Sequence, residues 1–379
     1  MKACTRDDSL DILKGLACLA MVIAHQPYFF KMPELAPGLI QYIAAAIPPT
    51  IFFAVAGVTA AFQASKYSLF SLTRYFLAMF LIGLTWNIAI HGDITAFYWV
   101  EIFQIIALGS LCVCVVEHHA RAPQWLLFTL SAAIIFIKLI VETYCPQFDG
   151  WNYLFCDTAY VWELSAAQTK NPVLPGFPLF PWLAYFFLGA WCYRLSKHMK
   201  LIAAIAALIA TLICVYFGSS IAEKWDSPIA HILADITLMV IAFWLFDGYS
   251  IADSRAAELL QKIGSNAFLF FFAHPFGLAG GVIIFATTNN AYLAWAISIV
   301  VSIASYNLLA KIKPSKAFDS RSAWLVMISV IVLLPLSTLL IKHDSALIIT
   351  RLLAIVIGTI TAVNFNALSR LTKVSKKLQ

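Results

Sequence analysis

The sequence predicts an all-α, polytopic integral membrane protein. Of its 379 residues, 62% are hydrophobic and only 12% are charged, whereas soluble domains carry about 25% charged residues. The apolar runs are continuous rather than alternating, which excludes a transmembrane β-barrel. The net charge of +6 does not indicate nucleic-acid binding, since an excess of Lys and Arg is typical of cytoplasmic loops.

Twelve apolar segments each suit a membrane-spanning helix of about 20 residues, so we expect about 12 spans. Lys and Arg gather in alternate loops, and the positive-inside rule therefore places both termini in the cytoplasm. The first segment carries charge and continues as a full span, so no cleavable signal peptide is expected. The predicted segments are 9–30, 39–63, 73–90, 97–116, 124–143, 179–195, 201–219, 229–246, 264–287, 292–310, 323–341 and 345–366.

The first segment, 9–30, carries most of the ionisable groups. Asp11, Lys14, Cys18 and His25 fall within roughly 60° of one another at 100° per residue, and so form one polar stripe. Ionisable groups at membrane depth are costly and usually functional. The alternative is that Asp11 and Lys14 lie at the interface, while His25 is a hydrogen-bonded packing residue.

Further candidates stand in the third, fourth and sixth segments. Arg74 lies at the cytoplasmic end of its segment, where it can either snorkel to the interface or hold a phosphate. Glu101 and Gln104 share a helix face, either as ligands for a substrate or as a structural pair. Trp182 suits the outer interface, as part of an aromatic belt or as a ring on which a sugar stacks.

Prolines and a second histidine mark two other segments. The ninth reads KIGSNAFLFFFAHPFGLAGG and places Asn266 near the inner face and His274 near the midplane. The following Pro275 predicts a broken helix at a site. Pro48 and Pro49 predict that the second helix kinks or starts there.

The loop 144–178 is the longest connection. Its aromatic residues argue against disorder, so we interpret it as a cap over an outward-opening site, with interfacial anchoring by Trp as the alternative. Cys145 and Cys156 share this loop, and whether they are bonded stays open. His118 and His119 are adjacent and so point to different helix faces, and only Glu117 lies at metal-ligand spacing from them, so no metal is expected.

Five blocks together resemble the transmembrane acyltransferase superfamily, which includes the acyltransferase 3 family and heparan-α-glucosaminide N-acetyltransferase. The blocks read, in order, RDDSLDILKGLACLAMVIAHQ, PPTIFFAVAGVTAAF, VEIFQIIALGSL, FPLFPWLAYFFLGAW and IGSNAFLFFFAHPF. The match extends to about residue 280. We treat 1–379 as a single acyltransferase-like domain, with its motifs in 6–287 and scaffold helices in 288–379.

The resemblance implies an acyltransferase that transfers groups other than aminoacyl groups. Its co-substrate would be cytoplasmic acyl-CoA, with acetyl-CoA as the default. The acceptor would be a hydroxyl or amine of a sugar or glycan at or across the membrane. His25 matches the first-helix histidine proposed for catalysis in acyltransferase 3 members, whereas some heparan-branch relatives have Asn there, which makes His274 a second candidate. Arg74 is only a partial match to an Arg pair of that family, which favours the heparan branch. A bacterial inner (plasma) membrane is the expected location.

The coenzyme A phosphates should stay at the cytoplasmic face, near Lys14 and Arg74. His25 would act as general base or as the nucleophile of an acyl-histidine relay. We expect Glu101 to orient it, and Gln104 or Asn266 to position the acyl oxygen or acceptor. The alternative function is a proton-coupled secondary transporter of a small molecule. Whether the chain forms a homodimer stays open.

Overall fold

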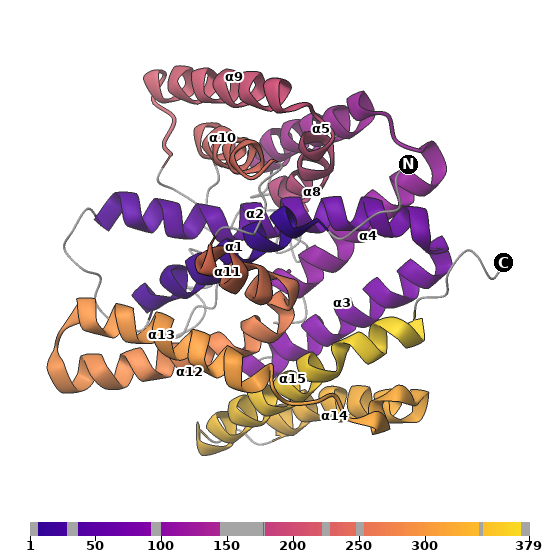
Figure 1. Ribbon diagram of the computed structural model, residues 1–379, viewed down its shortest axis with the longest axis vertical. Coiled ribbons are helices and arrows are strands. Elements are labelled where there is room, and N and C mark those ends of the chain that lie inside the picture. The colour runs from indigo at the N-terminus through magenta and orange to yellow at the C-terminus, as the bar shows by residue number, and fades with distance from the viewer. Residues whose placement is uncertain are drawn as a thin grey trace. The chain divides into compact units, whose positions relative to one another are not determined.

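The structure is a computed structural model that describes residues 7–28, 37–91, 100–144, 177, 179–221, 228–247, 254–340 and 344–372. In these ranges the chain is helical and contains no strand (Figure 1). The α-helices are α1 (Asp8–His25), α2 (Pro37–Lys66), α3 (Leu69–His91), α4 (Ile102–Ala120), α5 (Gln124–Tyr144), α8 (Leu179–Tyr193), α9 (Lys197–Tyr216), α10 (Ile229–Leu245), α11 (Arg255–Ser265), α12 (Ala267–Thr288), α13 (Ala291–Leu309), α14 (Arg321–Leu340) and α15 (Asp344–Thr372).

The all-α prediction is confirmed, and each predicted apolar segment overlaps a helix, although 264–287 includes the junction between α11 and α12. Among the described residues, 6 helices are long and apolar enough to cross a membrane. The total of about 12 spans and the orientation of the termini stay predictions. The six candidate spans are Ile47–Lys66, Leu69–Asn87, Ile102–Ala120, Lys197–Tyr216, Ala267–Thr288 and Ala291–Leu309.

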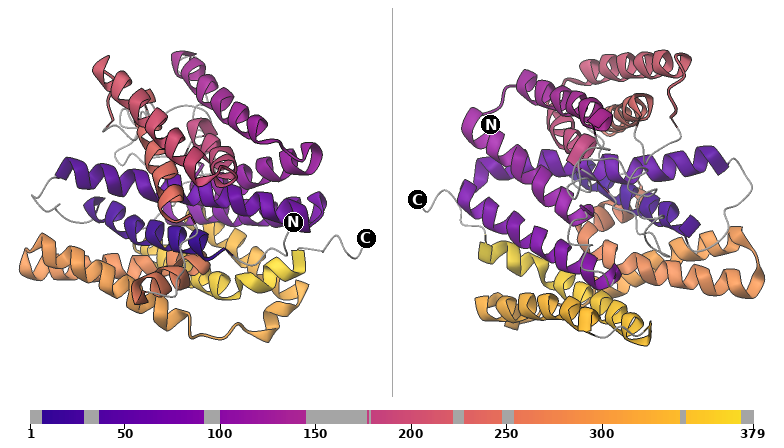
Figure 2. Two further views of the ribbon diagram at one scale, coloured as in Figure 1. Left: turned by 45° about the horizontal axis from the view of Figure 1, so that its top comes forward. Right: turned by 180° about the vertical axis from the view of Figure 1, so that it is seen from behind.

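The chain divides into two compact units. Unit 1 consists of Met1–Val55, Leu195–Lys224 and Pro228–Lys313, and unit 2 consists of Ala56–Arg194, Trp225–Ser227 and Pro314–Gln379. Within unit 1, α12 and α13 form a hairpin, α9 pairs with α10, and α1 packs against α11. The α12–α13 hairpin, drawn in orange, keeps its two helices side by side in both views of Figure 2.

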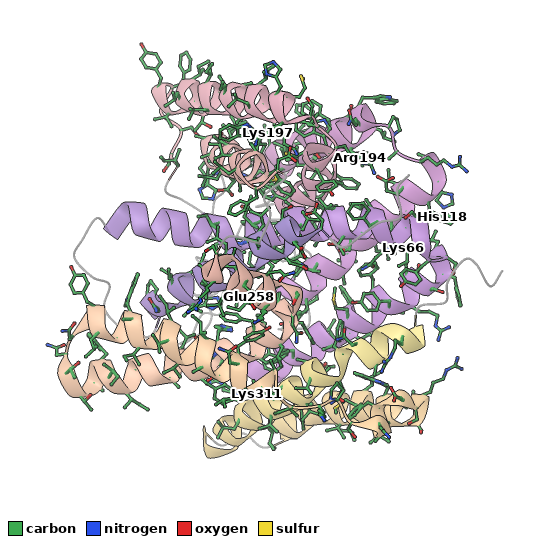
Figure 3. All side chains as sticks on the ribbon, in the orientation of Figure 1. Lys66, His118, Arg194, Lys197, Glu258 and Lys311 are labelled. Carbon is green, nitrogen blue, oxygen red and sulfur yellow. The ribbon has the colours of Figure 1, made fainter. Side chains whose placement is uncertain are left out.

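Helix α11 was not among the predicted helices, because it is short and polar on one face. Its Glu258 and Lys262 pair at 2.6 Å across one turn, and the hydrogen bond from Lys262 lowers the pKa of the Glu258 carboxyl. Figure 3 shows Glu258 on this helix. The pair is solvent-exposed, so it contributes little to stability.

Two glycines bring α1 and α11 close together. A Cβ on Gly15 would lie 2.0 Å from the carbonyl oxygen of Leu260, and one on Gly264 would lie 1.7 Å from that of Asp11. Real side chains cannot approach so closely, so the contact requires glycine at both positions. The amide of Gln261 also donates to Asp8 Oδ1 at 2.7 Å. These contacts fix the half of α1 that carries Asp11.

Unit 2 is organised around α8 and the α3–α4 pair. A Cβ on Gly57 would clash with the backbone of Phe186, and one on Gly109 would meet its ring. At the end of α8, the guanidinium of Arg194 pairs with Glu117 and donates to the carbonyl of Ala122 at 2.7 Å. Figure 3 labels Arg194. Helices α14 and α15 pack on α3.

A helix start at Pro48 and Pro49 is wrong, because α2 begins at Pro37 and continues through both prolines to Lys66, whereas a kink at these prolines stays a prediction. The expected cap, 144–178, and the Cys145–Cys156 question lie almost wholly outside the described residues. The prediction of a single domain over 1–379 stays a prediction.

Candidate active site

Two histidines that are 249 residues apart in the chain meet inside unit 1. His25 is the last residue of α1, and its Nδ1 lies 3.1 Å from Nε2 of His274 on α12. Their ring centroids are 5.1 Å apart and the rings are tilted by 33°. His274 is buried, with 4% of its surface exposed, while His25 is partly buried. The structure therefore joins the two candidate catalytic histidines into one pair.

Pro275 explains how His274 is held. A proline lacks an N–H, so within a helix it leaves the carbonyl four residues earlier without its usual donor. That carbonyl belongs to Phe271, and His274 Nδ1 lies 2.6 Å from its oxygen. The imidazole replaces the missing backbone donor. The predicted break at Pro275 is consequently wrong, since α12 continues unbroken from Ala267 to Thr288.

The hydrogen bonds fix the order of protons along the pair. A carbonyl oxygen can only accept, so Nδ1 of His274 must carry a proton and donate to Phe271. In the neutral ring, Nε2 of His274 is then the acceptor, and Nδ1 of His25 must be its donor. The remaining lone pair of a neutral His25 resides on Nε2. The geometry thus defines His25 Nε2 as the basic atom and His274 Nε2 as the next proton acceptor.

Asp11 and Lys14, two predicted binding residues, form an ion pair on α1. Lys14 Nζ lies 2.7 Å from Asp11 Oδ1, with the carboxylate side chain 5% exposed and the lysine side chain 23% exposed. Both belong to the polar stripe that ends at His25. Cys18, on the same stripe, is fully buried. Lys14 keeps part of its surface open, as a phosphate contact requires.

Asn266 joins α11 to α12 and ends one helix as the other begins. Its backbone N–H donates to Ile263, and its carbonyl accepts from Leu269 and Phe270. Nearby, the hydroxyl of Tyr306 donates to the carbonyl of Lys262 at 2.5 Å. The observed role of the Asn266 backbone is therefore to shape this turn, and substrate contact by its side chain stays a prediction.

The other predicted site residues belong to unit 2. Glu101 is the N-cap of α4 and makes no side-chain capping hydrogen bond. Gln104 is 1% exposed, and its Oε1 would lie 3.0 Å from a Cβ added to Gly83 on α3. Neither polar atom of the Gln104 amide has a hydrogen-bond partner among the described residues. Gln104 therefore points into the α3–α4 contact.

Arg74 and Trp182 have contrasting surroundings. Arg74 is exposed, with its guanidinium carbon 5.7 Å from the centre of the Phe70 ring. Trp182 is buried, with 3% of its surface exposed, and packs against the rings of Phe177 and Tyr185 at 5.2 and 5.5 Å. An exposed guanidinium can bind a phosphate, whereas a buried indole acts first as packing.

A second buried polar cluster in unit 1 was not predicted from the sequence. His231 and Asp235 lie one turn apart on α10, with Nε2 and Oδ2 3.6 Å apart and both side chains at most 1% exposed. Thr50 donates to Asp235 Oδ2 at 3.3 Å, and His231 Nδ1 lies 2.8 Å from the carbonyl of Ile221. The available signal was an ionisable pair at i, i+4 inside an apolar run.

Groups of metal-binding side chains were also sought. In the part of the chain that the structure describes, no three His, Cys, Asp or Glu side chains are grouped to hold an ion. The expectation that the protein uses no metal stays a prediction.

Comparison with known proteins places the chain in a family. The family model described as heparan-alpha-glucosaminide N-acetyltransferase, catalytic, matches residues 6–219, which is more than half of the 379 residues. The chain belongs to this family. No curated protein and no solved structure matches it. The resemblance drawn from the five sequence blocks is thus confirmed at the level of the acetyltransferase family.

The family match includes His25 but ends before α12. His274, Pro275 and the α12–α13 hairpin follow residue 219, so the second half of the histidine pair comes from a part of the chain that the match does not include. Only the three-dimensional structure connects the two.

Proposed function

We propose that this membrane acetyltransferase moves an acyl group, by default acetyl, from cytoplasmic acyl-CoA to a hydroxyl or amine of a sugar or glycan acceptor. The observation that carries the proposal is the ordered histidine pair in a chain of this family. A base whose lone pair is fixed on one nitrogen, with a second imidazole behind it, suits deprotonation of an acceptor.

The transfer begins with the acceptor. Nε2 of His25 takes a proton from the hydroxyl or ammonium group, while Nδ1 of His25 can pass its own proton to Nε2 of His274. The deprotonated acceptor attacks the thioester carbonyl, a new C–O or C–N bond forms, and the C–S bond breaks. The coenzyme A thiolate leaves and takes up the proton held by the pair, which returns the pair to its starting state, and an ammonium acceptor releases its second proton to solvent.

His274 fulfils the orienting role first expected of Glu101. It accepts the Nδ1–H of His25 and is itself fixed by Phe271. Glu101 and Gln104 belong to unit 2, and the substrate roles expected of them stay predictions. An acyl-histidine relay would use the same Nε2 atom of His25 as nucleophile, and we propose direct transfer because the second histidine supports proton removal.

Coenzyme A carries phosphate charges that cannot enter hydrocarbon. Lys14 is partly exposed beside Asp11, and Arg74 is exposed on α3, so both suit phosphate binding at the cytoplasmic face. Trp182 is better suited to packing within unit 2 than to stacking a sugar, since its ring is buried.

The test is thiol release from acetyl-CoA by purified protein with a panel of amino sugars and glycans. Wild type is compared with His25→Ala and with His198→Ala, a matched control in which the lost imidazole is exposed on α9. General-base catalysis contributes about 100- to 10,000-fold. We expect a loss of that order in His25→Ala alone. Full activity of folded His25→Ala would overturn the assignment, and proton-coupled flux without thioester loss would favour the transporter.

A further inference from the structure

The residue that follows the catalytic base carries a buried polar atom with no partner. Gln26 is 0% exposed, and its Nε2 donates to the backbone carbonyl of Trp295 at 3.1 Å. The other end of the same amide, Oε1, is buried and has no hydrogen-bond partner among the described residues. An unpaired buried acceptor is costly, so its retention beside His25 calls for an explanation.

Trp295 supplies the complementary group. It lies in the second turn of α13, and its indole Nε1 is likewise buried without a hydrogen-bond partner in the ranges that the structure covers. An indole N–H only donates, whereas an amide Oε1 only accepts. Two residues that already touch through one hydrogen bond therefore present one unsatisfied donor and one unsatisfied acceptor.

Both residues are tied to the histidine pair. Gln26 continues the chain directly from His25, in the short 3-10 turn Gln26–Tyr28. Trp295 belongs to the helix that packs along α12, which carries His274. The two helices are linked near the pair, where Ser302 of α13 donates to the carbonyl of His274 at 3.4 Å. The two unsatisfied groups are thus held by the same helices that hold the base.

We propose that Gln26 and Trp295 form the subsite that binds one hydroxyl group of the acceptor sugar, a proposal that rests on the proposed function. A hydroxyl donates one hydrogen bond and accepts others, so it can donate to Gln26 Oε1 and accept from Trp295 Nε1. An ammonium group or a carboxylate would satisfy only one of the two. A site that hydrogen-bonds a hydroxyl rejects analogues that lack it, so this subsite determines acceptor specificity.

The test uses methyl α-D-glucosaminide and its analogues that each lack one hydroxyl. Gln26→Leu removes the Oε1 acceptor, together with the Nε2 donor to the carbonyl of Trp295, with little change in size. Trp295→Phe removes the N–H while it keeps an aromatic ring. Gln63→Leu in unit 2 and Trp244→Phe on α10 are the matched controls, because they make the same chemical changes elsewhere. The KM for the sugar and the KM for acetyl-CoA are measured separately in each variant, together with the thermal midpoint.

We expect both test variants to raise the KM for the sugar about 10-fold, which corresponds to the loss of one hydrogen bond, with the KM for acetyl-CoA changed less than about 2-fold. The wild-type preference for the parent sugar over one of the analogues should disappear in both. A rise in the KM for acetyl-CoA instead would assign the groups to the acyl donor. A lower thermal midpoint with both KM values unchanged would make them a structural or water-binding pair only.

A binding measurement separates this proposal from the proposed function. Radiolabelled methyl α-D-glucosaminide is titrated into His25→Ala protein without acetyl-CoA, with and without the Gln26 and Trp295 changes. Weaker binding in both variants supports the subsite even if wild type consumes no acetyl-CoA. Absence of sugar binding, or binding that neither change affects, overturns the subsite whether or not the enzyme turns over.

Discussion

Replacing Pro275 with alanine should make the protein more stable and less active. Because Pro275 has no N–H to donate to the carbonyl of Phe271, His274 Nδ1 donates to that oxygen instead, at 2.6 Å. Alanine restores a backbone N–H that competes for this carbonyl. Proline in a helix interior is about 3 kcal/mol less favourable than alanine, and the weakened imidazole hydrogen bond costs about 1 kcal/mol. We therefore expect the free energy of unfolding to rise by about 2 kcal/mol.

The loss of activity follows from the ring of His274. Once His274 Nδ1 no longer donates to Phe271, the neutral His274 ring can carry its proton on Nε2 instead. In that tautomer, His274 Nε2 cannot accept the hydrogen bond from His25 Nδ1. A hydrogen bond of about 1 to 1.4 kcal/mol corresponds to a 5- to 10-fold change in a population. We expect kcat/KM to fall by about that factor.

Thiol release and thermal unfolding measure both consequences in the same preparation. Pro48→Ala is the matched control, since Pro48 also lies inside a helix and should gain stability with kcat/KM changed less than about 2-fold. A Pro275→Ala protein that gains stability and keeps full kcat/KM would refute the claim that Phe271 sets the proton position. Loss of stability would show that the proline is needed for packing instead.

Three further outcomes are expected. Gly277→Ala should lower the free energy of unfolding by about 1 to 3 kcal/mol, because its Cβ would lie 2.0 Å from Ser302 Oγ. Gly280→Ala is the control, since its Cβ would meet its nearest atom at 3.5 Å. It should be neutral or stabilising when both variants are compared by thermal unfolding. Asp235→Ala should destabilise by about 1 to 3 kcal/mol in denaturant titration, since it removes the buried acceptor of the Thr50 hydroxyl, and an unchanged midpoint would contradict this. In a pH–rate profile, kcat/KM should fall as pH is lowered, because a proton on His25 Nε2 occupies the lone pair that would otherwise take the proton of the acceptor, and a flat acidic limb would count against a base.

The sequence predicts the helices well because their signal is local. Length and continuous apolarity locate every long helix that the structure describes, and the cost of charge at membrane depth singles out His25 and His274 before any contact is known. Their contact spans 249 residues and cannot be read from periodicity. The predicted break at Pro275 is wrong, because the imidazole of His274 replaces the backbone donor that the proline lacks. The local sequence does not show which side chain will take that place.

Residues with ordinary local surroundings were missed. Gln26 directly follows α1 and Trp295 lies in the second turn of α13, and only the structure shows that Gln26 Oε1 and Trp295 Nε1 have no hydrogen-bond partner among the described residues. Helix α11 escaped because it is short and half polar. The last third of the chain, predicted to be scaffold, contributes Trp295 beside the histidine pair.

The central claim is that His25 and His274 act as one unit, and a double-mutant cycle in kcat/KM for thiol release tests it most directly. Wild type, His25→Ala, His274→Ala and the double variant are compared after each is shown to be folded. Residues that act together give losses that do not add, so the double variant should be about as slow as His25→Ala alone. Losses that multiply in full would contradict the claim and assign the two histidines to independent roles.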